Sequence, residues 1–133
     1  MLRRLPKTEG KDSEAIQSAL WLDLLKPSPQ EEQAVEQTLK LNIPTREEMG
    51  EIEFSSRFYK QKETLVMTAT MIAHSLSTDP QVDSVTFILT PKQLITIRYI
   101  EPQAFQLAEA YIQKNMEQGI DATALLIGLL EAA

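Results

Sequence analysis

The stretch "SVTFILTPKQLITIRYI", residues 84–100, decides the fold class of this chain of 133 residues. It contains two apolar runs rich in β-branched residues, and the polar segment "PKQ" at residues 91–93 separates them. Apolar runs of this length with a short polar interruption are typical of a β-hairpin. The sequence therefore predicts two antiparallel strands, near residues 84–90 and 93–100.

Two more strands are predicted on the N-terminal side of this hairpin. The run "TLVMTATMIA", residues 64–73, carries apolar side chains on both faces, which favours a central strand covered on each side. The run "ALWLDLL", residues 19–25, is typical of a short buried strand. The polar stretch at residues 74–83 is expected to be a loop with its turn at Asp79–Pro80. With a candidate strand near the N-terminus, these runs make a sheet of about five strands.

The segment after residue 25 predicts a helix with a well-defined start. Ser28 is a good N-cap, Pro29 suits the first helical position, and Glu31 follows the serine by three residues. This is the spacing of a capping box, in which two side chains satisfy free backbone N–H groups. Val35 lies on the apolar face of the helix, and we expect the helix to end near Asn42.

A second helix start follows in "IPTREEMGEIEFSSRFY", residues 43–59, which packs several glutamates together. Thr45 and Glu48 have capping-box spacing, and acids in a first turn complement the helix dipole. Helix capping is thus the ordinary interpretation of Glu47 and Glu48. Glu51 lies beyond the first turn and shares a face with Glu47, and such a like-charge pair costs about 0.2–0.5 kcal/mol. From the residues alone, Glu51 is either a solvated surface residue or a cation ligand.

Two helices are predicted after the hairpin. Pro102 suits the first position of one helix, and Gly119 would end it. Asp121 is expected to cap the last helix, "ATALLIGLLEAA", which is apolar almost all round and so should be buried or bound to a partner. The chain stops at Ala133 without a C-cap or a basic last turn, so we expect it to be the front part of a longer protein.

Composition excludes several classes of function. The net charge is −6, from 19 acidic against 13 basic residues, which disfavours nucleic acid and anionic lipid as partners. The absence of cysteine rules out disulfides and thiolate zinc sites. The N-terminus lacks the apolar run of a signal peptide, and no apolar stretch approaches the ~20 residues of a membrane helix. We expect a single soluble domain in a reducing compartment.

No catalytic residue is predicted. The four glycines are scattered, so there is no phosphate-binding loop, and no Ser/His/Asp or Cys/His set exists. His74 is the single histidine and is expected at the surface, at a strand end. The residues alone therefore indicate an acidic α/β domain with a binding or regulatory role, and not an enzyme.

Three motifs together resemble a known family. They are the "WLDL" opening at residues 21–24, the segment "PTREEMGEIEFSSRFY" at residues 44–59 and the hairpin "VTFILTPKQLITIRY" at residues 85–99. In this order they resemble the N-terminal cytoplasmic domain of the bacterial CorA family of divalent-cation transporters. The resemblance covers about residues 19–133. The family's two C-terminal membrane helices, its Gly-Met-Asn motif and most of its stalk helix have no counterpart here.

The resemblance implies an α/β fold, an α/β/α sandwich with a mixed central sheet, followed by helices that lead toward the stalk. It implies one cytoplasmic regulatory domain over residues 1–133. Residues 1–18 would form an N-terminal segment or edge strand, residues 19–100 the sheet core with its helices, and residues 101–133 the start of the stalk region.

The resemblance also implies a function. In the family, five copies assemble as a homopentamer on the cytoplasmic side of the cell membrane, joined to the membrane through the C-terminal helices. The domain senses intracellular Mg²⁺ and gates a pore for Mg²⁺ and Co²⁺. A weakly bound regulatory Mg²⁺ lies between neighbouring subunits, and Glu51 matches the family's acidic ligand, with Glu47 as a possible second. Gly50 stands where many members carry another acid.

Two alternatives remain open at this point. One is the same domain of a zinc-transporting relative, because the loop that separates these groups lies outside residues 1–133. The other is a soluble protein-binding adaptor whose leucine-rich last helix docks onto a partner.

Overall fold

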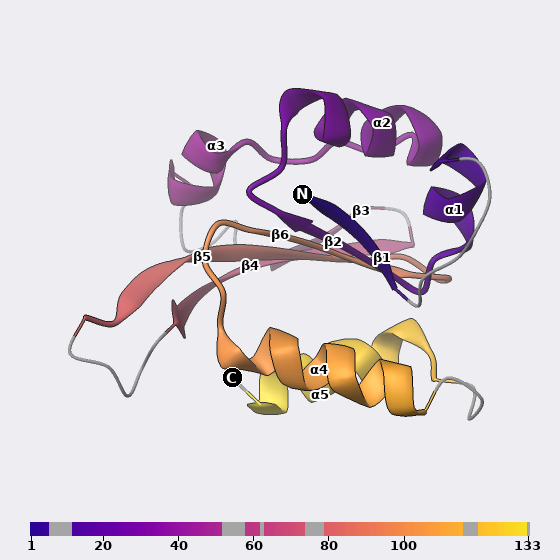
Figure 1. Ribbon diagram of the computed structural model, residues 1–133. Coiled ribbons are helices and arrows are strands. Elements are labelled where there is room, and N and C mark those ends of the chain that lie inside the picture. Colours follow the sequence, from indigo (N-terminus) through magenta and orange to yellow (C-terminus); the bar gives the residue numbers. More distant parts are fainter. Residues whose placement is uncertain (6–11, 52–57, 62, 74–78, 116–119, 133) are drawn as a thin grey trace.

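The computed structural model describes residues 1–5, 12–51, 58–61, 63–73, 79–115 and 120–132. Within these ranges six strands form one sheet in the order β1-β2-β6-β5-β4-β3 (Figure 1). The strands are β1 (Leu2–Leu5), β2 (Trp21–Leu25), β3 (Phe58–Gln61), β4 (Thr64–Ala73), β5 (Gln81–Leu89) and β6 (Leu94–Arg98). The sheet is mixed: β2 and β6 run parallel, and every other neighbouring pair runs antiparallel.

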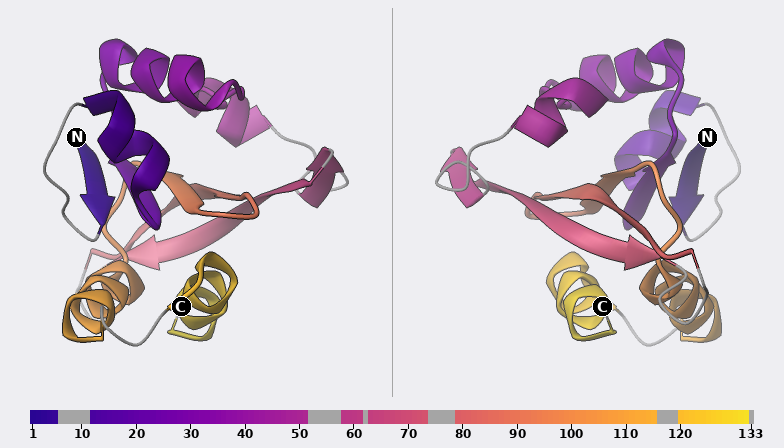
Figure 2. Two further views of the ribbon diagram at one scale, coloured as in Figure 1. Left: turned by 90° about the vertical axis from the view of Figure 1, so that its right-hand side faces the viewer. Right: turned by 90° about the vertical axis from the view of Figure 1, so that its left-hand side faces the viewer.

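Helices cover both faces of this sheet, as Figures 1 and 2 show. One face carries α1 (Asp12–Ser18), α2 (Pro29–Leu39) and α3 (Arg46–Glu51), and the other carries α4 (Gln103–Lys114) and α5 (Ala122–Ala132). The architecture is therefore the predicted α/β/α sandwich. The two faces bury separate hydrophobic clusters, one under each layer of helices.

The hairpin that the sequence predicts is present between β5 and β6. Leu89 pairs with Leu94 at its closed end. Thr90 forms the turn, because its backbone N–H donates to the Gln93 carbonyl at 3.0 Å and its hydroxyl accepts from the Gln93 N–H at 3.0 Å. The Gln93 side chain is buried and donates to the carbonyls of Ile16 and Ala19. The hairpin turn is thus tied to the end of α1.

Strand β2 is buried along its whole length, as predicted. Its side chains alternate between the two clusters: Trp21 packs on the α4 side, and Leu22 and Leu24 pack on the α2 side. The Trp21 ring lies 5.8 Å from the Phe105 ring of α4, centroid to centroid. Each apolar side chain buried here contributes about 1.5–3 kcal/mol relative to exposure. The strand therefore holds both layers together.

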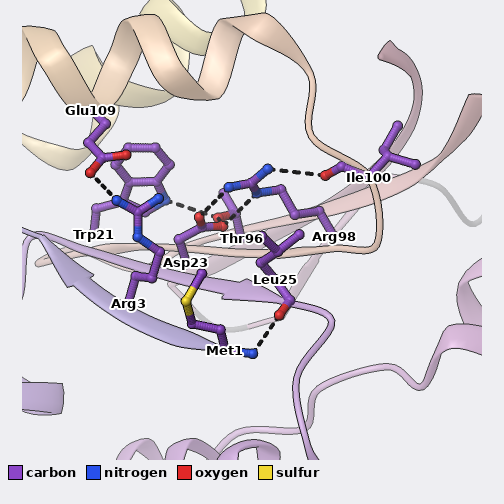
Figure 3. Close-up of polar contacts among 9 residues, drawn as sticks. All are labelled: Met1, Arg3, Trp21, Asp23, Leu25, Thr96, Arg98, Ile100 and Glu109. Atoms are coloured by element: carbon purple, nitrogen blue, oxygen red, sulfur yellow. Dashed lines mark hydrogen bonds and ion pairs between the residues drawn. The ribbon is translucent and has the colours of Figure 1, made fainter. Parts of the chain in front are cut away.

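A fully buried polar network crosses the parallel pair β2–β6 (Figure 3). Arg98 donates to both carboxylate oxygens of Asp23, through Nη2 at 2.7 Å and Nε at 3.0 Å. The Thr96 hydroxyl donates to Asp23 Oδ1 at 2.9 Å and accepts from the Trp21 indole N–H at 3.0 Å. Among the described residues no buried side-chain polar atom lacks a partner. Asp23 and Arg98 are therefore satisfied in spite of their burial.

The same arginine connects the sheet to the α4 layer. Its Nη1 donates to the Ile100 carbonyl at 3.1 Å, and its guanidinium carbon lies 4.3 Å from the centroid of the Phe105 ring. At the neighbouring edge, Arg3 of β1 forms an ion pair with Glu109 of α4 (Figure 3). Two arginines on the sheet thus contact α4.

Three expectations about the strands need correction. The N-terminal strand exists as β1, but α1 and the edge strand β3 were not predicted, so the sheet has one strand more than expected. The loop predicted at residues 74–83 was extended too far. Residues Gln81–Asp83 belong to β5 and pair with Met71–Ala73 of β4. There β4 and β5 form a two-stranded ribbon beyond the rest of the sheet, where solvent accepts polar side chains (Figure 1).

The ribbon also corrects the expectation that β4 is covered on both faces. Val66 and Thr68 are buried, but Thr70 and Ile72 are exposed on the same face. Ile72 is 53% exposed and lies opposite Val82, which is 60% exposed. The helices above the sheet do not reach this end of the strand.

The helix starts follow the predicted caps. Glu31 N–H donates to the Ser28 hydroxyl at 3.2 Å, and Ser28 N–H donates to Glu31 Oε1 at 3.0 Å, which confirms the first capping box. The helix ends two residues before Asn42, at Lys40, whose φ of 54° is left-handed. Pro102 caps α4 rather than occupying its first helical position.

The C-terminal helices also follow the pattern in part. Helix α4 ends at Lys114, and Gly119, its expected end, lies outside the described residues. The Ala124 N–H donates to Asp121 at 2.7 Å, so the predicted cap of α5 is confirmed. Leu125 and Leu129 of α5 are buried. The exposed large apolar residues of α5 are Ile127 and Leu130, at 50% and 42%.

The buried ion pair generates a first prediction. Arg98→Met should lower the free energy of unfolding by about 3–5 kcal/mol, because it leaves the Asp23 carboxylate buried without its cation. The double variant Asp23→Leu/Arg98→Met should recover much of that loss, since it removes both charges together. Urea denaturation followed by circular dichroism measures both values. A double variant as unstable as the single one would mean that Arg98 acts through packing instead.

A second prediction concerns Glu31 and acid stability. Burial of its carboxylate raises the pKa, but hydrogen bonds from the backbone of Ser28, the Met1 ammonium and the backbone of Leu2 outweigh burial and lower the pKa from 4.5 to about 2. A lowered folded-state pKa stabilises the fold above pH 4.5, and this stabilisation is lost as pH falls from 4.5 toward 2. Glu31→Gln should cost up to about 1 kcal/mol near neutral pH, because glutamine can keep the capping box but loses the ion pair with the Met1 ammonium.

The control for this prediction is the same comparison in acid. The difference in unfolding free energy between wild type and Glu31→Gln should shrink as pH falls from about 5 to 2, because Glu31 is protonated first in the unfolded chain and then in the folded protein. A difference that stays constant over this range would show that the negative charge of Glu31 contributes nothing to stability.

Candidate functional site

The candidate site is a surface where α2, α3 and the start of β5 bring carboxylates together around Tyr99. We call it the acidic surface, and its members are Glu32 and Glu36 of α2, Glu47 of α3 and Asp83 of β5. Glu47 is exposed, and the other three are partly buried. Tyr99 follows directly after β6, so the hairpin strand positions the ring beneath the two helices.

Helix α3 begins with the second predicted capping box. The Glu48 N–H donates to the Thr45 hydroxyl at 3.1 Å, and the Thr45 N–H donates to the Glu48 carboxylate at 3.1 Å. Glu48 is therefore confirmed as a capping residue. Met49 is 1% exposed and packs in the cluster beneath α2, which attaches α3 to the sheet.

The three sequence-predicted acids thus have different surroundings. Glu48 holds the helix start, while Glu47 projects from the first turn into solvent. Glu51 is the last residue of α3, and its side chain lies outside what the structure describes. The metal-binding roles expected for Glu51 and Glu47 therefore stay predictions. His74 also lies outside the described residues.

Arg46 is the cation of this site, and it joins α3 to the sheet. Its guanidinium carbon lies 4.8 Å from the centroid of the Tyr99 ring, within the range of a cation–π contact. Its Nη2 is 3.4 Å from Asp83 Oδ2. One side chain on α3 thus contacts both the segment after β6 and the start of β5.

The acidic surface perturbs two of its own groups. Burial raises the pKa of Glu32, the charges of Glu36 and Glu47 raise it further, and a hydrogen bond with Tyr99 opposes the rise. Burial likewise raises the pKa of the Tyr99 hydroxyl, with the charge of Glu32 as the next contribution, while Arg46 acts in the opposite direction. Among the described residues, the four carboxylates of this surface carry more negative charge than Arg46 balances.

This arrangement suits weak cation attraction rather than tight chelation. Among the described side chains, no three His, Cys, Asp or Glu groups come together closely enough to hold a metal ion. Mg²⁺ dehydrates reluctantly and is commonly held by one or two carboxylates and several waters. Exposed single carboxylates such as Glu47 are compatible with such a water-rich site, and a neighbouring molecule would have to complete it.

A groove of about 490 Å³ lies beside the acidic surface, between the end of α2 and strands β3 and β4. Val66 and Ile88 form an apolar floor, and Glu36, Lys40 and Asn42 lie among its other lining residues. Charges of both signs around an apolar floor do not single out one class of ligand.

Sequence reasoning missed Arg46, Tyr99 and Glu32 as members of the site. No periodicity links them, because they come from three elements that are brought together only by the fold. The available signal was the position of Tyr99 at the end of a buried strand, where an aromatic side chain often contacts the helix layer. Of the members of the acidic surface, the family resemblance had named Glu47, and local spacing identified Thr45 and Glu48 as the cap of α3.

Within the described part of the chain, no helix combines the length and apolar character needed to cross a bilayer. A family model described as CorA-like Mg²⁺ transporter protein matches residues 17–133, which is nearly the whole chain.

Several proteins with related sequences are magnesium transport proteins named CorA. The magnesium transport protein CorA of Wolinella succinogenes is 35% identical over 111 residues, which cover 78% of this chain and 35% of the relative. Its counterpart in Campylobacter jejuni is 34% identical over 122 residues, covering 83% and 37%. The CorA protein of Salmonella typhimurium is 27% identical over 128 residues, which cover 96% of this chain and 40% of that protein. The chain thus spans about a third to two fifths of these relatives' length.

Solved structures match the fold at low sequence identity. The soluble domain of CorA from Methanocaldococcus jannaschii superposes with a TM-score of 0.64 at 12% identity, covering 98% of this chain and 54% of that one. The complete CorA magnesium transporter from the same organism gives 0.65 at 12% identity, covering 96% and 39%. At this identity the match establishes the fold alone.

The acidic surface generates a prediction about charge. Glu32→Gln should raise Tm near neutral pH by about 1–2 °C, because it removes one like charge beside Glu36 and Glu47 while an amide oxygen can still accept from Tyr99. The folded-state pKa of Glu32 is raised, so its charged form is the destabilising one and the gain should disappear in acid. Calorimetry at neutral pH and at about pH 4 tests this. An equal gain at both values would rule out charge repulsion.

Proposed function

The chain belongs to the CorA-like Mg²⁺ transporter family, and we propose that it is the cytoplasmic domain through which such a transporter senses intracellular Mg²⁺ and gates its pore. The family consists of transport proteins, so the chain is not an enzyme. The observation that carries the proposal is the family match over residues 17–133, combined with an exposed acidic turn at Glu47 on the surface of the fold.

The proposed mechanism uses carboxylates that face a neighbouring copy. Without a cation, two carboxylates about 4 Å apart repel by roughly 4 kcal/mol at an effective dielectric of 20. A partly hydrated Mg²⁺ between them removes this repulsion and favours the closed assembly. Repeated around a homopentamer, the gain is large enough to bias a two-state ring. We place Glu51, and secondarily Glu47, on this interface.

A weak site is appropriate to this role. Intracellular Mg²⁺ is abundant, so a sensor must release the ion when its concentration falls modestly, and few protein ligands with several waters achieve this. The carboxylates that complete the site would come from the stalk helix of the neighbouring subunit. The domain would lie on the cytoplasmic side of the membrane, connected to it through helices beyond residue 133. Transport of Co²⁺ belongs to the same proposal.

Two alternatives follow from specific observations. A zinc-transporting relative would share this domain, since the acidic surface does not select among divalent cations. A soluble adaptor is favoured by the exposed Ile127 and Leu130 of α5, which could contact a partner protein. The reading frame that encodes the chain separates these cases. A frame that continues into two apolar segments near its end supports a transporter, and one that stops at residue 133 supports the adaptor.

The regulatory role of Glu51 generates the next prediction. In the full-length transporter, Glu51→Gln should raise the Mg²⁺ concentration at which protection against proteolysis is half-maximal. The substitution removes one ligand charge without changing side-chain volume. Glu48→Gln is the matched control on the same helix. It should have little effect, since glutamine also completes a capping box. The measurement is limited proteolysis over a Mg²⁺ titration.

The outcome that contradicts the proposal is equally specific. If Glu51→Gln shifts the protecting Mg²⁺ concentration no more than Glu48→Gln does, then residue 51 is a solvated position and the sensing site lies elsewhere. Uptake of Mg²⁺ by cells that express either variant should stay at or above the wild-type value, because weaker closure leaves the pore open at higher internal Mg²⁺.

A further inference from the structure

Helix α3 is too short to set its own orientation. It contains six residues, Arg46–Glu51, and isolated helices of this length are unstable in water. Its direction therefore depends on side chains that contact the rest of the fold. Those that the structure describes are Met49, buried in the cluster beneath α2, and Arg46, which contacts Tyr99 and Asp83.

The helical period separates these attachments from the acidic positions. At about 100° per residue, positions 46 and 49 lie about 60° apart, so both can face the sheet. Positions 47 and 51 lie one turn apart on the side away from Met49. One flexible buried methionine fixes the location of the helix but leaves its rotation adjustable. A second contact is needed to fix which way the acidic side faces.

Arg46 supplies this second contact. Its guanidinium lies over the Tyr99 ring at 4.8 Å, and its Nη2 is 3.4 Å from Asp83. The Tyr99 ring is partly buried and packs against the cluster beneath α2, which limits its movement. Arginine suits the role better than lysine, since its planar group stacks on a ring and pairs with a carboxylate at the same time.

We propose that Arg46 is a positioning residue: stacked on Tyr99 and paired with Asp83, it fixes the rotation of α3 and so the direction of the helix face that carries Glu47 and residue 51. The inference rests on the proposed function, in which this face binds regulatory Mg²⁺ against a neighbouring subunit. Arg46 itself binds no ion. It acts on Mg²⁺ only through the orientation of α3.

Charge and positioning predict opposite effects, and this makes the proposal testable. Arg46→Gln removes a cation from an acidic surface, so a purely electrostatic role would strengthen Mg²⁺ binding and lower the protecting concentration. If Arg46 positions α3, the Mg²⁺ concentration that protects the protein should rise instead. We expect a rise of about two- to fivefold, which corresponds to the free energy of one exposed cation–π contact. Tyr99→Leu changes no charge and should raise it by a similar factor.

The experiment is proteolytic protection of the full-length transporter by Mg²⁺, with the thermal midpoint of each variant measured in parallel. Tyr99→Phe keeps the ring and should shift the protecting concentration less than Tyr99→Leu does. Lys92→Gln, which removes an exposed cation from the distant β5–β6 turn, controls for net charge. In the double variant Arg46→Gln/Tyr99→Leu the shift should match that of either single variant, because the two residues form one contact.

Each result either supports the inference or overturns it. A protecting concentration that falls or stays constant in Arg46→Gln, while Glu51→Gln raises it, overturns the positioning role and leaves the Mg²⁺ site intact. So does a loss of thermal stability in Arg46→Gln and Tyr99→Leu with no change in Mg²⁺ response, which indicates a structural role only. If Mg²⁺ does not protect the wild type, the proposed function fails, and this inference fails with it.

Discussion

The buried ion pair between Asp23 and Arg98 is the constraint on which the rest of the structure depends. A charge in the core must be paired, so β2 and β6 have to lie side by side in one register, with Leu25 opposite Arg98. This parallel pairing requires the chain to cross over between the two strands, and the crossover supplies helices for one face. Because Arg98 also stacks on Phe105, α4 must turn directly onto the other face. One arginine therefore contacts both the parallel strand pair and the helix layer on the other face.

The sequence predicts those parts of the fold whose signals are local. The hairpin at residues 84–100, the buried strand at residue 21 and both capping boxes depend on neighbours within a few positions, where composition and spacing are informative. Strand β3 was not predicted, because its four residues follow an acidic sequence with a helix pattern. They form a strand by pairing with β4. The start of β5 was not predicted, because the segment Gln81–Asp83 is mostly polar. On a ribbon exposed to solvent, such a segment can still form strand hydrogen bonds. For the candidate site the limit was the same: Glu48 was identified by its spacing, whereas Arg46, Tyr99 and Glu32 meet only through the fold.

Carboxylates serve three different purposes on the α2–α3 side of the sheet. Glu31 and Glu48 accept backbone hydrogen bonds and hold helix starts, and these would cost stability if removed. Glu32 and Asp83 surround Tyr99 and Arg46, where charge is partly balanced. Glu47 is exposed and has no such internal task described, so it is available to a neighbouring molecule or an ion. Neighbouring acidic residues in one stretch of sequence therefore have different roles. The position of each acid relative to the unpaired backbone N–H groups of a helix start decides which role it has.

The parallel pairing of β2 with β6 has a consequence for folding during synthesis on the ribosome. The contact between Asp23 and Arg98 joins residues 75 positions apart, so β1 and β2 leave the ribosome long before β6 is synthesised. During that interval β2 can pair with β1 alone, and its other edge is free to pair wrongly with another chain. The local pairs β3–β4, β4–β5 and β5–β6 can assemble as a meander as soon as they emerge, and β2 must then join it last. Asp23 thus meets Arg98 only after most of the sheet has been synthesised.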